Sequence, residues 1–239
     1  MAFGNGPRII TDGLVLSLDA GDRNSYPGSG TIWNDMSGNG NNGTLTNGPT
    51  FSNNGIVFDG SNDYVNCGSN ASTLLTSITI NATFSFSTYS STHIIVGRLG
   101  NPGGGYRHNY FYGITNSRLY FGFKQASVSA YPYIWIDSVV TLNKIYNFTV
   151  TYSVASSIGV YLSGQPQSYS GPNTISNPII TNQIMDADIG STICGIGSGV
   201  AESTYYSNAT VYNSQIYNRA LSSEEVLQNY NAQKSRFNL

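Results

Sequence analysis

The chain has 239 residues and a formal net charge of −2, and only 9% of its residues are charged, against about 25% in typical soluble domains. The lack of excess positive charge excludes the electrostatic footprint of a nucleic-acid-binding protein. The sequence has no run of about 18 apolar residues, so we expect no membrane insertion. Its length fits one all-β domain over residues 1–239.

Neutral polar residues take the place of the missing charges. Asn, Ser, Thr and Gly are abundant, and Tyr occurs 18 times. Tyr combines an apolar ring with a polar hydroxyl, so it can contact sugars and protein surfaces alike. We therefore expect a surface for binding or assembly rather than a catalytic centre.

Short strands and turns are predicted over residues 13–68. Leu14, Leu16 and Leu18 alternate with other residues, and we expect all three to point to one face. Two further short strands are expected over residues 55–60 and 64–67, with Gly- and Asn-rich turns between them.

The clearest strand signal covers residues 77–87. One face is predicted to point inward and consists of Ile78, Ile80, Ala82, Phe84 and Phe86. The other face, predicted to point outward, consists of Thr79, Asn81, Thr83 and Ser85. A period of two over this length excludes a helix.

A β-hairpin is predicted over residues 106–124, with its turn at Asn116-Ser117. This register pairs Ile114 with Leu119, Tyr112 with Phe121 and Tyr110 with Phe123 on one face, and Phe111 with Gly122 and Gly113 with Tyr120 on the other. Large rings laid across glycines are a known cross-strand arrangement.

Further strands are expected over residues 146–152, 158–162, 188–195 and 209–217. The close spacing of strands and turns favours a two-sheet antiparallel sandwich.

One helix is predicted near the C-terminus. Ser222 is its expected N-cap, Glu225 completes a capping box, and Leu221 is expected to pack on Val226 as a hydrophobic staple. Val226, Leu227 and Tyr230 form the predicted apolar stripe.

Four segments carry a family resemblance: Gly13-Leu-Val-Leu-Ser-Leu-Asp-Ala, Trp33-Asn-Asp-Met-Ser-Gly-Asn-Gly-Asn-Asn-Gly-Thr-Leu, Val57-Phe-Asp-Gly-Ser-Asn-Asp-Tyr-Val and Ile216-Tyr-Asn-Arg-Ala-Leu-Ser-Ser-Glu-Glu-Val. Together they resemble the concanavalin A-like, laminin G-type jelly-roll domains found in phage and cyanophage structural proteins. The resemblance implies two curved antiparallel sheets with a short helix closing one end. It does not fix a function, because this fold serves many.

The resemblance and the composition together lead us to expect a non-catalytic phage structural protein on the virion surface, as a capsid decoration or a tail or fibre component. Its expected partners are other virion proteins, further copies of itself in a homo-oligomer, and a host surface glycan. The first residues lack the apolar segment of an export signal, which fits release by lysis. The alternative is a lectin-like module that recognises cell-surface polysaccharide.

Catalysis is not expected. Glycoside hydrolysis requires paired carboxylates, and the chain has only three Glu, of which Glu224 and Glu225 belong to the predicted helix and Glu202 has no partner at a useful spacing. Of the two histidines, His93 is expected at a strand edge. His108 lies among aromatic residues, where a ligand contact stays open.

No cofactor is expected, although calcium stays open as an alternative. Asp35 begins a segment similar to the first half of a calcium loop, but Thr46 stands where the bidentate acid should be. We interpret Asp35, and likewise Asp59 and Asp63, as residues that hold turns through backbone hydrogen bonds. Cys67 and Cys194 are expected to be two buried thiols, with one long-range disulfide as the alternative.

The strongest functional candidates are aromatic. We expect Tyr106, His108, Tyr131, Tyr133 and Trp135 to contact a glycan or a partner protein, since Tyr and Trp are enriched in interfaces. The alternative places these aromatic segments in the sandwich core and in cross-strand pairs.

Overall fold

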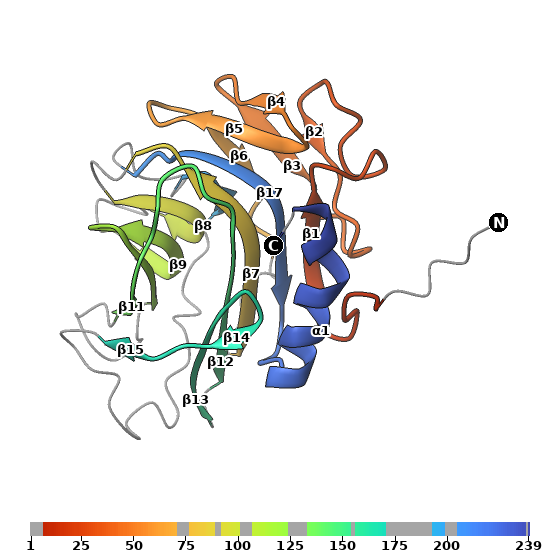
Figure 1. Ribbon diagram of the computed structural model, residues 1–239. Coiled ribbons are helices and arrows are strands. Elements are labelled where there is room, and N and C mark those ends of the chain that lie inside the picture. Colours follow the sequence, from red (N-terminus) through yellow and green to blue (C-terminus); the bar gives the residue numbers. More distant parts are fainter. Residues whose placement is uncertain are drawn as a thin grey trace.

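Alternating apolar and polar residues produce two antiparallel sheets that pack face to face, with one α-helix near the C-terminus (Figure 1). This computed structural model describes residues 7–70, 77–88, 92–100, 107–123, 133–153, 156–170, 193–198, 205–237 and 239. The predicted all-β sandwich with a short C-terminal helix is confirmed.

Sheet A has eight strands. Their order is β14 (Gln165–Pro166), β13 (Ser156–Leu162), β12 (Tyr146–Ser153), β7 (Ile78–Phe86), β17 (Asn208–Tyr217), β5 (Gly55–Asp59) and β4 (Thr50–Ser52), and β1 (Leu14–Asp19) also pairs with β17. β7 and β17 come from distant parts of the chain and lie side by side at its centre (Figure 1).

Sheet B has nine strands. Their order is β15 (Tyr169–Ser170), β11 (Tyr133–Val139), β10 (Arg118–Phe123), β9 (Arg107–Thr115), β8 (His93–Gly100), β16 (Ile193–Ile196), β6 (Tyr64–Asn66), β3 (Gly43–Thr46) and β2 (Ile32–Trp33). Of the strand predicted over residues 188–195, residues 188–192 lie outside the described part of the chain.

The main core lies between the two sheets. The inward face predicted for β7 is buried as expected, and Tyr112 of β9 stacks on Phe148 of β12 with ring centroids 4.8 Å apart. The Tyr112 hydroxyl also donates to the Phe148 carbonyl. Burial raises the pKa of Tyr112 well above its ordinary value, so the hydroxyl stays neutral and remains a donor.

The predicted hairpin is confirmed residue by residue. β9 and β10 pair with Tyr112 opposite Phe121, Phe111 opposite Gly122 and Gly113 opposite Tyr120. Asn116 and Ser117 have φ angles of 48° and 64°. Positive φ at both central residues is the mark of a type I′ turn, whose twist matches that of the strands it joins.

The prediction that Leu14, Leu16 and Leu18 face one way is wrong. The register of β1 on β17 shifts between Leu14 and Leu16, and a β-bulge of this kind turns the residue before it to the other face. Leu16 and Leu18 enter the main core, whereas Leu14 joins a separate cluster with Tyr217 and Val226.

The outward face of β7 points as predicted but is largely buried. Its first three polar residues are 0–1% exposed: Thr79, Asn81 and Thr83. The Asn81 side chain donates to Gln215 over 2.5 Å and accepts from Asn147 and Thr149 over 3.0 and 2.8 Å. These neutral groups satisfy one another, which is what allows a polar face to be buried.

Helix α1 (Ser223–Gln233) begins as predicted, with both hydrogen bonds of the capping box between Ser222 and Glu225 formed. Leu221 and Val226 belong to one buried cluster. The helix packs beside β1 and β17, outside sheet A (Figure 1). It is not long and apolar enough to span a membrane, and no other described helix is.

The predicted apolar stripe of α1 is wrong at Leu227, which is 37% exposed. The face toward sheet A instead carries Val226, Asn229 and Gln233. Asn229 accepts from the Ile10 amide and donates to the Tyr217 hydroxyl. Two amide side chains are buried here because the sheet offers them polar partners.

Glu225→Gln is expected to lower the free energy of unfolding by about 0.5 kcal/mol at pH 7, because Gln keeps the capping box but loses the ion pair. The Glu225 carboxylate accepts two hydrogen bonds from Arg219 over 2.7 Å, and these lower its pKa. That stabilisation is present above the ordinary Glu pKa and is lost as the pH falls through the lowered value. Urea titrations of the wild type and the variant from pH 6 to 3 measure both effects.

Glu224→Gln is the matched control, because Glu224 has no hydrogen bond or ion pair with Arg219. It removes the same charge one residue away. Equal pH dependence of unfolding in wild type and Glu225→Gln would contradict the assignment.

Candidate functional site

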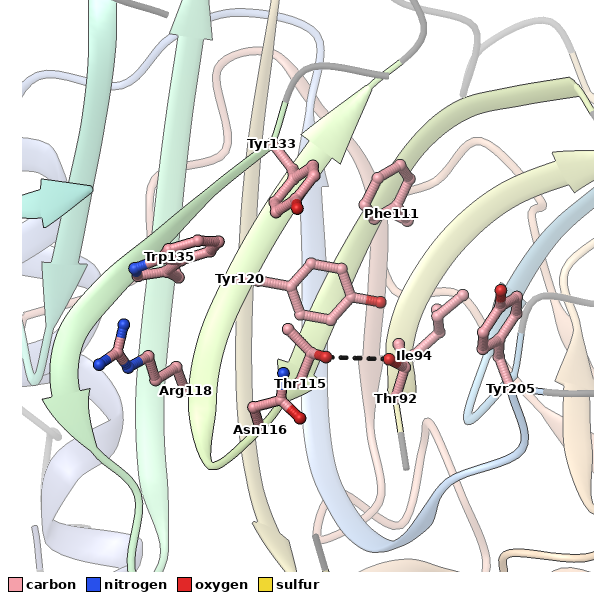
Figure 2. Close-up of a pocket in the computed structure, with 10 residues that line it drawn as sticks. All are labelled: Thr92, Ile94, Phe111, Thr115, Asn116, Arg118, Tyr120, Tyr133, Trp135 and Tyr205. Carbon is pink, nitrogen blue, oxygen red and sulfur yellow. Dashed lines mark hydrogen bonds between the residues drawn. The ribbon is translucent and has the colours of Figure 1, made fainter. Parts of the chain in front are cut away.

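A pocket lies on the face of sheet B that points away from the core. Its volume is about 600 Å³, within the range of small-ligand sites. The residues that line it are Thr92, Ile94, Phe111, Thr115, Asn116, Arg118, Tyr120, Tyr133, Trp135 and Tyr205 (Figure 2).

Strand alternation builds this pocket from the same strands that fill the core. In β9 and β10, Tyr112 and Phe121 face the core, so their neighbours Phe111 and Tyr120 face the pocket. In β11, Ile134 faces the core and its neighbours face the pocket. One run of aromatic residues thus serves both faces of one sheet.

Four rings form the floor and one side of the pocket, and we call them the aromatic platform: Phe111, Tyr120, Tyr133 and Trp135 (Figure 2). The centroids of Phe111 and Tyr120 are 5.5 Å apart, and those of Tyr133 and Trp135 are 5.6 Å apart. Phe111 and Tyr120 are buried, whereas Tyr133 and Trp135 are partly exposed. The platform belongs to a cluster separate from the main core.

Two glycines allow close packing on this part of the sheet, one against a ring and one against the neighbouring strand. A Cβ atom on Gly122 would be 2.1 Å from the Phe111 ring. Gly113 stands opposite Tyr120, and a Cβ there would be 2.0 Å from the His93 carbonyl oxygen. Any larger residue would force the neighbouring strand or ring to move.

Polar groups surround the platform. The hydroxyls of Thr92 and Thr115 are 2.9 Å apart at the end of the pocket near the hairpin turn (Figure 2). Asn116 is exposed in that turn. The Arg118 guanidinium lies over the Trp135 ring, 5.7 Å from its centroid. The buried Trp135 Nε1 has no hydrogen-bond partner among the described residues.

The structure places the predicted site residues in three ways. Tyr133 and Trp135 line the pocket. Tyr106 and Tyr131 lie outside the described residues. His108 lies in β9 opposite Leu99 of β8.

His93 lies at the end of its strand as expected, but its side chain is buried. It begins β8, an inner strand of sheet B between β9 and β16, and it is only 2% exposed. Its Nδ1 lies 3.0 Å from the Tyr206 carbonyl oxygen. Packing of the segment that contains Tyr206 against β8 covers the ring, which the local sequence did not reveal.

Beyond Tyr133 and Trp135, the predicted site set contains none of the described lining residues, and it therefore missed Arg118 and Tyr205. The predicted hairpin register already set Arg118 two residues before Tyr120, and hence on the same strand face. This signal was available. Tyr205 comes from a segment about 85 residues further along the chain than Tyr120, and no local pattern connects the two.

Asp35 has hydrogen-bond partners within the fold, and the two cysteines are buried thiols. The Asp35 carboxylate accepts hydrogen bonds from the Ser17, Ser37 and Asn41 amides over 2.8–3.0 Å, so it holds the turn as interpreted. Cys67 and Cys194 are free and buried. No group of three potential metal ligands occurs within the described ranges.

Asp59 and Asp63 also take part in hydrogen bonds within their own turn. Backbone hydrogen bonds, above all that from Ser61, lower the pKa of Asp59. Asp63 accepts from the Asp59 amide over 3.1 Å. Glu202 lies outside the described residues, and none of the described residues that line the pocket is a carboxylate.

Comparisons with known proteins identify the fold. No protein-family model matches the chain, and no curated protein matches it. The chain is similar to Trypanosoma rangeli sialidase in complex with sialic acid, with a TM-score of 0.65 and 19% identity over 98% of this chain and 36% of the sialidase. It is also similar to the receptor binding domain of a botulinum neurotoxin C/D mosaic serotype, with a TM-score of 0.65 and 15% identity over 94% and 52%.

A third similar structure is the botulinum neurotoxin serotype D ligand binding domain in complex with N-acetylneuraminic acid, with a TM-score of 0.63, 15% identity and the same coverage. The chain spans about a third of the sialidase and about half of the toxin domains. At these identities the similarity shows a shared sandwich fold.

Gly113→Ala is expected to destabilise the protein by about 3 kcal/mol or more, whereas Gly122→Ala is expected to cost about 1–2 kcal/mol. The added methyl group of the first meets a backbone carbonyl, which moves only with its strand. That of the second meets the outer end of the Phe111 ring, which can swing aside. Thermal and urea unfolding measure the difference, and equal costs would contradict this account of the two glycines.

Proposed function

We propose that this chain is a non-catalytic carbohydrate-binding domain that holds a sugar ring against the aromatic platform. The observation that carries this proposal is the set of rings gathered on a sheet face outside the core, around a cavity of about 600 Å³. A pyranose presents apolar C–H groups on its faces and hydroxyls at its edge. Aromatic rings with a polar rim complement both.

The rim supports the same proposal. Thr92, Thr115, Asn116 and the Tyr205 side chain border the pocket (Figure 2) and supply neutral donors and acceptors. Such groups bind hydroxyls without the cost of burying a charge. Two structures with a similar fold are complexes with sialic acid or N-acetylneuraminic acid, which shows that proteins with this architecture occur in sugar complexes.

Binding rather than hydrolysis fits the described lining. The mechanism used by most glycosidases needs one carboxyl group as acid and a second as base or nucleophile. The described lining contains Arg118 as its one charged residue and no carboxylate. We therefore propose a binding role without turnover, and without a cofactor.

A location on the virion surface stays a prediction of the family resemblance, together with virion partners and a homo-oligomer. A glycan-binding domain there would attach the particle to its host. Mass spectrometry of purified particles tests this location, and absence of the chain from them would reject it.

Trp135→Ala is expected to weaken glycan binding at least about fivefold, because truncating a central aromatic contact typically costs more than about 1 kcal/mol. A glycan array identifies the ligand, and isothermal titration calorimetry with and without EDTA measures its affinity. We expect no effect of EDTA, since binding is proposed to need no calcium.

Tyr212→Ala is the matched control. Tyr212 is also a partly exposed aromatic residue, but it lies in sheet A against Phe237. It should leave affinity unchanged. The proposal fails if wild-type protein binds no glycan at millimolar concentration, or if Trp135→Ala binds like the wild type.

A further inference from the structure

Arg118 is the one charged side chain among the described residues that line the pocket. It directly follows the type I′ turn at Asn116 and Ser117, and the β10–β9 register places it opposite Thr115. The side chain is exposed. Figure 2 shows it extending beside Trp135 at one side of the pocket. Its position therefore derives from a well-defined turn and two strands.

The Arg118 guanidinium has no hydrogen bond or ion pair with any residue in the described part of the chain. The guanidinium carbon lies over the Trp135 ring, 5.7 Å from its centroid. Asp137 follows Trp135 by two residues in β11, but its carboxylate accepts from the Ser170 hydroxyl over 3.0 Å. No ion pair joins it to Arg118.

The guanidinium has no hydrogen-bond or ion-pair partner among the described residues, so its N–H donors are available to a ligand. The five N–H donors of arginine lie in the plane of the group, and their fork matches the two oxygens of a carboxylate. The contact with Trp135 also restricts the side chain before a ligand arrives, which lowers the entropy lost on binding. The described part of the lining thus holds one cation beside the aromatic platform and is otherwise neutral.

We propose that this pocket selects sugars that carry a carboxylate, and that Arg118 pairs with the acid group while the sugar ring stacks on the aromatic platform. This inference rests on the proposed carbohydrate-binding function. Two classes of glycan supply the chemistry: sialic acids, with a carboxylate at the anomeric carbon, and uronic acids, with a carboxylate at C6.

A purely structural role for Arg118 is the alternative. Cation–π contact at an exposed site stabilises a fold modestly, and a residue with only that role would treat acidic and neutral sugars alike. The two roles therefore differ in the ratio of affinities for acidic and neutral sugars. Affinity for one ligand alone would not separate them.

The test uses ligand pairs that differ only in the acid. One pair is sialyllactose and lactose; the other is a glucuronic acid disaccharide and its carboxyl-reduced form. Calorimetry measures wild type, Arg118→Gln and Arg118→Lys. We expect wild type to bind one acidic sugar about tenfold more tightly than its neutral partner, as for hydrogen bonds to a charged group.

Arg118→Gln should bring the ratio of acidic-sugar to neutral-sugar affinity near one and should change neutral-sugar binding by less than about twofold. Arg118→Lys should give a ratio between those of Arg118→Gln and the wild type, because lysine keeps the charge but lacks the forked donors of arginine. Raising the salt concentration from about 0.05 to 0.5 M should weaken only acidic-sugar binding. The pair that shows the preference identifies the sialic or the uronic acid.

Lys144→Gln is the matched control. Lys144 is an exposed cation that lies over the ring of Tyr146, 5.4 Å from its centroid, and it does not line the pocket. Its replacement removes the same charge and the same kind of ring contact elsewhere. It should leave both affinities unchanged.

The possible results distinguish a failure of carboxylate selection from a failure of carbohydrate binding. Acidic and neutral sugars bound equally by wild type, or an unchanged ratio in Arg118→Gln, would overturn carboxylate selection and leave carbohydrate binding intact. No binding of any sugar by wild type would overturn the proposed function itself. Unchanged thermal unfolding of Arg118→Gln confirms that the comparison concerns binding.

Discussion

Packing of the two sheets against each other decides which face of β9, β10 and β11 is open to a ligand. The stacked rings of Tyr112 and Phe148 and the hydrogen bond between these residues join the sheets at the centre of the core. Once Tyr112 points inward, its neighbour Phe111 points outward. The aromatic platform follows from the same alternation that fills the core.

Two glycines allow these strands to carry large residues on both faces of the sheet. A sheet face crowded with large residues normally holds its rings upright, whereas the gap at Gly122 receives the Phe111 ring. Gly113 lets β8 approach closely, with the His93 carbonyl oxygen in the space that a side chain would fill. The floor of the pocket therefore depends on residues that contribute no side chain of their own.

The small number of charged residues has two consequences in the structure. Some of the abundant amide and hydroxyl groups are buried, as in the network around Asn81 on the outer face of sheet A, although the composition suggested a role on the surface. Among the described residues that line the pocket, Arg118 is the one charged side chain. None of the described lining residues pairs with Arg118 through a salt bridge, so its charge remains available to a ligand.

Local pattern by itself determined much of this molecule: the strands around residues 78–86 and 146–162, the hairpin register, the turn at Asn116-Ser117 and the capped helix. Each depends on neighbours within a few positions in the chain or directly across a tight turn. The positions of Tyr133 and Trp135 beside Phe111 and Tyr120, the contact of Arg118 with Trp135, and the burial of Thr79 and Leu14 depend on which strands meet. Only the tertiary structure decided these, because pairing between distant strands and the β-bulge in β1 leave no local periodic signal.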